Sequence, residues 1–134
     1  MKVLYISPST IPSRAANSVH VIHQCYSLAE KVNKIKLIYH DNLNYNSNIK
    51  QYIKDNFNLK AENIEFICLS RRFTIGINFF IAILAFIHIL RNKRYELIIS
   101  RNLYAAFIIS NILGKRVIYE THFLELGVRK LIQY

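Results

Sequence analysis

Polar side chains that could bind a ligand stand directly after the apolar segments of this chain. The loop after the first apolar segment contains hydroxyl, amide and basic groups, and Arg101, Glu120 and His122 follow two later apolar segments. Ligands of open parallel sheets bind outside the carboxyl ends of the strands, so residues at these ends are candidates for one shared site. The expected substrate-binding residues are Ser13, Arg14, Asn17, Ser18, His20, Arg101 and Glu120.

The stretch from Lys2 to Glu30 organises this site. A strand, Val3–Ser7, leads through a loop of small residues into a helix that should begin near Val19. Free backbone N–H groups and the helix dipole converge at such a helix start and favour an anion. We expect Asn17 to be the N-cap of this helix.

The rest of the chain alternates between short apolar runs and helical patterns. Near-continuous apolar strands separated by helices predict a parallel sheet that is buried on both faces. We therefore expect an α/β, Rossmann-like fold, with an open parallel sheet of about five strands and helices on both faces. The expected strands are Val3–Ser7, Lys36–His40, Ile64–Leu69, Glu96–Arg101 and Arg116–Thr121. Beyond the first, the expected helices are about Asn48–Phe57, Phe73–Leu90, and Leu103–Leu113 with Gly114 as its C-cap.

The 18 residues of Phe73–Leu90 contain no charged side chain and lie between two basic clusters. As one helix they would be about 27 Å long, a little less than the roughly 30 Å hydrocarbon core of a bilayer. We favour a buried crossover helix between the third and fourth strands. The first alternative is peripheral contact with an anionic membrane, and a membrane span is the second. The flanking cations that would meet lipid headgroups are Arg71, Arg72, Arg91, Lys93 and Arg94.

The formal net charge of +10 would suit nucleic acid, anionic lipid or a phosphorylated substrate. The basic residues are not interleaved with an aromatic platform and no recognition-helix motif is present, so we expect no nucleic-acid partner. The chain starts directly with a strand, and Cys25 and Cys68 are interpreted as reduced core residues. These features predict a cytoplasmic location, which includes the inner face of the cytoplasmic membrane.

Some candidate residues have simpler interpretations. His20 could be a solvated helix residue, and Arg101 could merely pair with Glu120 on the adjacent strand. We favour a guanidinium that faces the substrate. No carboxylate stands at metal-ligand spacing beside His23, His40 or His88, and we expect no metal.

Four sequence blocks, in order and at matching spacing, make the chain resemble a known family. It is similar to the N-terminal domain of a family 4 glycosyltransferase of the two-Rossmann-domain (GT-B) type. The blocks are Met1–Ser7, Pro12–His20, Ile98–Tyr104 and Gly114–His122. The resemblance implies a retaining, metal-independent transfer of a sugar from a nucleotide sugar to a polysaccharide or glycolipid acceptor, with no cofactor.

The same resemblance assigns roles within the site. His122 would be the catalytic residue beside the reacting sugar, and the loop at Ser13–Ser18 would line the cleft near the donor diphosphate. The partners implied are a nucleotide sugar and a saccharide or lipid-linked acceptor. In such enzymes this domain mainly receives the acceptor.

The resemblance also implies a domain organisation. Residues 1–122 would form the N-terminal domain and residues 123–134 the start of a following helix that is cut short. We expect a fragment that lacks the donor-binding domain and is inactive alone. The alternative function is a non-catalytic Rossmann-like module that binds a phosphorylated ligand or an anionic membrane surface.

Overall fold

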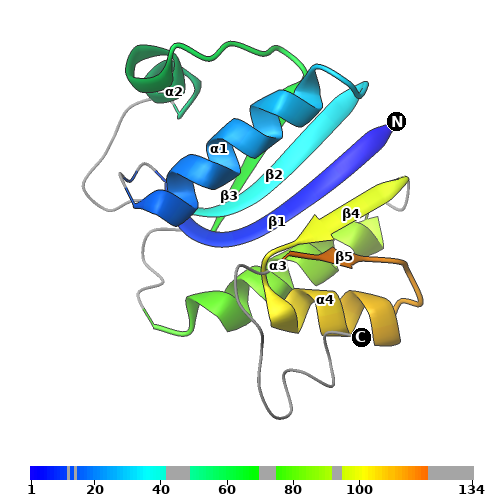
Figure 1. The fold of residues 1–134 in the computed structure, drawn as a ribbon. Helices are drawn as coiled ribbons and strands as arrows, with labels where there is room; N and C mark the ends of the chain where they lie inside the picture. Colours follow the sequence, from blue (N-terminus) through cyan, green and yellow to red (C-terminus); the bar gives the residue numbers. More distant parts are fainter. Residues whose placement is uncertain (12, 14, 42–48, 70–74, 92–94, 121–134) are drawn as a thin grey trace.

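The computed structural model of the protein describes residues 1–11, 13, 15–41, 49–69, 75–91 and 95–120. Five parallel strands form one open sheet in the order β3-β2-β1-β4-β5, so the predicted Rossmann-like α/β fold is confirmed. Helices α1 and α2 lie on one face of the sheet, and α3 and α4 lie on the other (Figure 1). The elements are β1 (Lys2–Ile11), α1 (Ala16–Ala29), β2 (Lys34–Asp41), α2 (Ile49–Phe57), β3 (Ile64–Leu69), α3 (Ile77–Arg91), β4 (Leu97–Ser100), α4 (Leu103–Asn111) and β5 (Ile118–Tyr119).

The central strand β1 divides the core into two layers. Val3 and Tyr5 belong to the cluster beneath α1 and α2, whereas Leu4 and Ile6 belong to the cluster against α3 and α4. All four side chains are fully buried. Successive side chains of a strand point to opposite faces, so a continuous apolar run is what a strand covered on both sides requires.

The first strand is longer than predicted. It continues past Ser7 to Ile11, and its pairing with β2 shifts between Ile6 and Thr10. At this irregularity the Ser7 hydroxyl accepts a hydrogen bond from the backbone N–H of Ser9 at 3.1 Å. Irregularities of this kind re-aim a strand end, and here the change lies at the carboxyl end of β1.

The predicted start and cap of the first helix are wrong. Helix α1 begins at Ala16 with Ala15 as its N-cap, and no side chain accepts a hydrogen bond at that cap. Asn17 is an exposed residue inside the helix. Ala16 joins the helix because alanine costs nothing in helical conformation, whereas Ala15 keeps an extended backbone as the N-cap.

The remaining elements match the expected order with different ends, and β2 is longer than predicted at both ends. Helix α4 ends at Asn111 with Ile112 as its C-cap, so Gly114 follows the cap rather than forming it. Its φ of +65° is one that favours glycine. The strand predicted at Arg116–Thr121 is reduced to Ile118–Tyr119, and its residue Thr121 lies outside the described part.

Helix α3 is the crossover helix between β3 and β4, as the apolar segment predicted. Its core side is formed by Ile81, Ala82, Ala85 and Ile89. Among the described residues no helix is both long enough and apolar enough to span a bilayer.

The two cysteines differ in their surroundings. Cys25 is a buried free thiol of the α1 core, as expected. The prediction that Cys68 is a core residue is wrong, since its thiol is exposed on β3. The strand order explains the difference, because β3 is an edge strand of the sheet.

Candidate functional site

A polar cluster lies on the α1 side of the sheet, where β4 and β5 end. The Tyr5 hydroxyl donates to Glu120 Oε2 at 2.8 Å and lies 3.1 Å from Gln24 Oε1. The Gln24 side-chain amide donates to the other carboxylate oxygen of Glu120. Three elements therefore meet at one carboxylate: the central strand, helix α1 and the residue directly after β5.

Arg101 enters the same cluster from the end of β4. Its side chain acts on the Tyr5 hydroxyl, whose pKa it lowers against the larger effect of burial, and its backbone N–H donates to the carbonyl of Ile6 at 2.8 Å. No ion pair joins Arg101 to Glu120 in the described part of the chain, so the simple pairing alternative is wrong. Both residues contact Tyr5 instead.

One nitrogen of Arg101 has no hydrogen-bond partner in the part of the chain that the structure describes. This atom, Nη1, is buried. A buried donor without a partner is costly, and such groups in native structures call for an explanation such as a bound molecule. Arg101 also lies where the strand order reverses between β1 and β4, which is the ligand-binding position of open α/β sheets.

The cluster has a distinct electrostatic character. Burial, the hydrogen bond to Glu120 and the Glu120 charge raise the pKa of Tyr5, while the hydrogen bond from Arg101 opposes this shift. Burial and then the Glu120 charge also raise the pKa of the neighbouring Cys25. The phenol and the thiol are therefore neutral at physiological pH. The cluster can hold and orient a polar ligand, with Glu120 as its acceptor and Arg101 as its cation.

A second polar group lies where β1 and β2 end. Thr10 Oγ1 is 2.9 Å from Nδ1 of the buried His40. The Ser18 hydroxyl donates to the carbonyl of Thr10 at 2.8 Å. These bonds fix the end of β1 to β2 and to the start of α1, so Ser18 acts here as a structural residue.

The structure separates the predicted site residues into groups. Arg101 and Glu120 come together in the Tyr5 cluster. Ser13 accepts a hydrogen bond from the backbone N–H of Ala15 at 3.1 Å, and His20 is exposed on α1. The predicted residues Arg14 and His122 lie outside the described residues.

Asn102, next to Arg101, has a structural role. Its buried side-chain oxygen accepts from the backbone N–H groups of Tyr104 and Ala105 at 2.9 and 3.3 Å, which caps α4. Its amide donates to the carbonyl of Asn78 at 2.6 Å. These bonds hold the backbone that presents Arg101.

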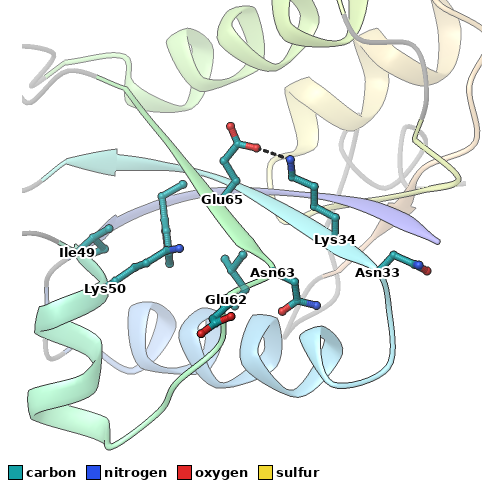
Figure 2. A pocket seen from close by; sticks show the side chains of 9 residues that line it. Asn33, Lys34, Ile49, Lys50, Glu62, Asn63 and Glu65 are labelled. Carbon is teal, nitrogen blue, oxygen red and sulfur yellow. Dashed lines mark ion pairs between the residues drawn. The ribbon is translucent and has the colours of Figure 1, made fainter.

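A hollow of about 640 Å³ lies elsewhere, along β3 (Figure 2). Lys34 and Lys36 both pair with Glu65, at 3.1 and 3.5 Å. The Asn63 amide donates to the carbonyls of Ala29 and Val32 at 2.7 and 3.0 Å. These polar groups hold secondary-structure elements together, so the hollow is a weaker candidate than the Tyr5 cluster.

Sequence reasoning missed Tyr5 and Gln24. Tyr5 reads as one more apolar residue of a buried strand, and Gln24 falls on the polar side of the α1 pattern. A hydroxyl inside a fully buried strand is the available signal, because a buried Tyr O–H usually finds a partner. Among the described residues no three His, Cys, Asp or Glu side chains gather as metal ligands.

Comparisons with models of protein families, with curated proteins and with solved structures give no match to this chain.

Proposed function

We propose that this chain is the acceptor-binding, N-terminal domain of a family 4-like glycosyltransferase of the GT-B type. In this proposal a sugar passes from a nucleotide sugar to a polysaccharide or glycolipid acceptor with retention of configuration. The observation that carries it is the buried Nη1 of Arg101, which has no hydrogen-bond partner among the described residues and belongs to the same Tyr5 cluster as the Glu120 carboxylate. A donor and an acceptor in one cluster match the hydroxyl groups of a saccharide, each of which can both donate and accept.

The four sequence blocks support the same proposal. Two of them, Ile98–Tyr104 and Gly114–His122, contain Arg101 and Glu120. A third, Met1–Ser7, contains Tyr5, which contacts both. Residues from separate parts of the resemblance thus support one cluster at the strand-order reversal, where such a fold binds ligands.

The reaction assigns distinct tasks to these groups. Glu120 orients an acceptor hydroxyl, and its own position is fixed by Tyr5 and Gln24. Arg101 binds an oxygen of the acceptor, and His122 stands beside the reacting sugar. Binding and orientation are the tasks of this domain, because holding reactants in the correct geometry lowers the barrier substantially.

Ligand binding tests the proposal directly. Saturation-transfer NMR of the 134-residue chain should detect short saccharides. The Arg101→Met variant should bind them roughly tenfold to a hundredfold more weakly, since a hydrogen bond from a charged group is worth about 1.5–3 kcal/mol. Lys60→Met, which removes an exposed cation far along the chain, is the matched control and should bind normally.

Two results would contradict this assignment. Saccharide affinity that is equal in Arg101→Met and the wild-type chain would remove Arg101 from the site. Binding of inorganic phosphate or a nucleoside diphosphate without any saccharide would favour the non-catalytic, phosphate-binding alternative. Transfer itself is measured with the full-length gene product and labelled nucleotide sugars, where His122→Ala should lower turnover far more than donor affinity.

A further inference from the structure

The exposed large apolar side chains of the described residues come mostly from the second half of the chain. Apart from Met1, every large apolar residue with an exposed side chain in the described ranges lies between Ile75 and Ile118. On α3, Phe79 is 54% and Leu90 46% exposed, and on α4, Tyr104 is 47% and Phe107 43% exposed. Helices α1 and α2 contribute none in the described part. In the described part of the chain, most of the exposed apolar side chains therefore belong to α3, α4 and the residue that follows α4.

The outer sides of α3 and α4 are neighbours. Both helices cover the same face of the sheet (Figure 1). The Asn102 amide donates to the carbonyl of Asn78 at 2.6 Å, which ties the first turn of α4 to the first turn of α3. Phe79 and Tyr104 are therefore on adjacent turns. We define the α3–α4 surface by its exposed residues Phe79, Ile87, Leu90, Tyr104, Phe107 and Ile112.

Positive charge accompanies this apolar surface. Arg91 ends α3 and Arg116 follows α4, and both side chains are exposed. Both helices cross over between parallel strands, so they run in the same direction and these cations lie at corresponding ends. Neither α3 nor α4 contains an acidic residue, whereas the basic residues Arg91, Lys115 and Arg116 lie at or after their C-terminal ends.

We propose that the α3–α4 surface binds the surface of an anionic lipid bilayer. Aromatic and aliphatic side chains next to cations are the composition that interfacial helices use, with apolar groups at the acyl boundary and cations at the headgroups. A second copy of this chain fits less well, because it would bring like charges together across the contact. The surface would bring a sugar transferase to a lipid-linked acceptor, but its lipid binding does not depend on that function.

Vesicle flotation of the full chain tests the proposal. The chain should float with phosphatidylcholine vesicles that contain phosphatidylglycerol, and much less with phosphatidylcholine alone. Added salt should weaken binding, because it screens the attraction between exposed charges and headgroups. The double variant Arg91→Glu, Arg116→Glu should bind at least roughly tenfold more weakly, since each cation near the membrane contributes about 1 kcal/mol.

Matched variants separate this surface from general charge. Lys54→Glu with Lys60→Glu makes the same change in net charge at exposed positions in and after α2 and should leave binding nearly unchanged. Phe79→Ser with Phe107→Ser should weaken binding roughly tenfold or more, since the loss of buried apolar area costs about 25 cal/mol per Å². Circular dichroism establishes that each variant is folded.

Three outcomes would overturn the proposal. These are no flotation with anionic vesicles at low salt, an equal loss in the two charge-reversal variants, and unchanged binding after the two Phe substitutions. Sedimentation equilibrium supplies a further test. A stable dimer that Phe79→Ser with Phe107→Ser converts to a monomer would show that a second copy covers this surface instead.

Discussion

The Tyr5 hydroxyl donates a hydrogen bond to Glu120 Oε2 at 2.8 Å, and so joins the first strand to the residue that follows the last described strand. Gln24 of α1 donates to the same carboxylate. The carboxylate is thereby held by two neutral donors rather than by an ion pair. Its position depends on these two bonds, and the Arg101 side chain also acts on the Tyr5 hydroxyl.

Replacement of Tyr5 by Phe should destabilise the fold measurably. The change leaves the half-buried Glu120 without one donor, and an unsatisfied buried group costs about 1–3 kcal/mol. Urea unfolding measures the difference in free energy. Tyr26→Phe, the same change at another buried tyrosine of the α1 core, should alter the unfolding free energy by less than about 0.5 kcal/mol. Equal effects of the two substitutions would mean that the Tyr5 hydroxyl adds nothing.

Replacement of Asn102 by Ala should cost more than replacement of Asn17 by Ala. Asn102 caps α4 through two backbone N–H groups, and loss of a cap costs about 0.5–2 kcal/mol before its bond to Asn78 is counted. Asn17 is exposed and caps nothing, so its effect should stay within about 0.5 kcal/mol. Chemical unfolding of both variants gives the comparison, and a larger loss in Asn17→Ala would place the helix start where the sequence pattern predicted it.

The stability of the fold should fall as the pH decreases through about 6.5 because of His88. Burial, and then the Lys36 charge, lower the pKa of His88, while Glu65 acts in the opposite direction. Its ring nitrogen Nε2 is paired with the Tyr95 hydroxyl. As the pH drops, the unfolded chain takes up a proton at the ordinary pKa of 6.5 before the folded chain does, so the unfolding free energy decreases. Unfolding curves at several pH values measure how the unfolding free energy depends on pH in this range. The His88→Gln variant should show a weaker dependence.

Glu65 should affect the stability of the fold in a separate, more acidic pH range. A hydrogen bond from Lys34, together with the charges of Lys34 and Lys36, lowers the pKa of Glu65 from 4.5. Its contribution is therefore present above pH 4.5 and is lost as the pH falls through the lowered value. Glu65→Gln should change the acid unfolding profile only in this range. A change near neutral pH would show that Glu65 acts through His88 instead.

The two thiols should react at very different rates. A thiol reagent should modify the exposed Cys68 in the folded protein, and the buried Cys25 only after unfolding. Burial and the Asp41 charge raise the pKa of Cys68, so its modification should accelerate toward alkaline pH, where the thiolate forms. Cys68→Ser should abolish the fast phase. If Cys25→Ser abolished it, the edge position of β3 would be wrong.

Local sequence patterns predicted the fold because they reflect which side chains of each strand and helix are buried. The apolar runs of β1 to β4 are buried on one or both faces, and that burial is what makes a strand recognisable in a sequence. Strand order is different, since it depends on contacts between distant segments. Cys68 resembled a core residue because nothing in Ile64–Leu69 states that this strand is at the edge.

For the same reason, only part of the candidate site could be predicted from the sequence. Arg101 and Glu120 were found because each follows a strand, and the carboxyl ends of parallel strands meet at one edge. Tyr5 and Gln24 were not, because their partners are 115 and 96 residues away in the chain. The Asn17 cap was predicted from residue type alone, while the backbone geometry chose Ala15.

The bond between Tyr5 and Glu120 also sets an order of events during synthesis. Tyr5 leaves the ribosome early, but its partner is made 115 residues later. At about 5–20 residues per second this delay is on the order of ten seconds. Throughout that time the hydroxyl of the central strand must remain hydrated or bind elsewhere, so the nascent chain cannot complete the α1 side of its sheet until Glu120 has emerged.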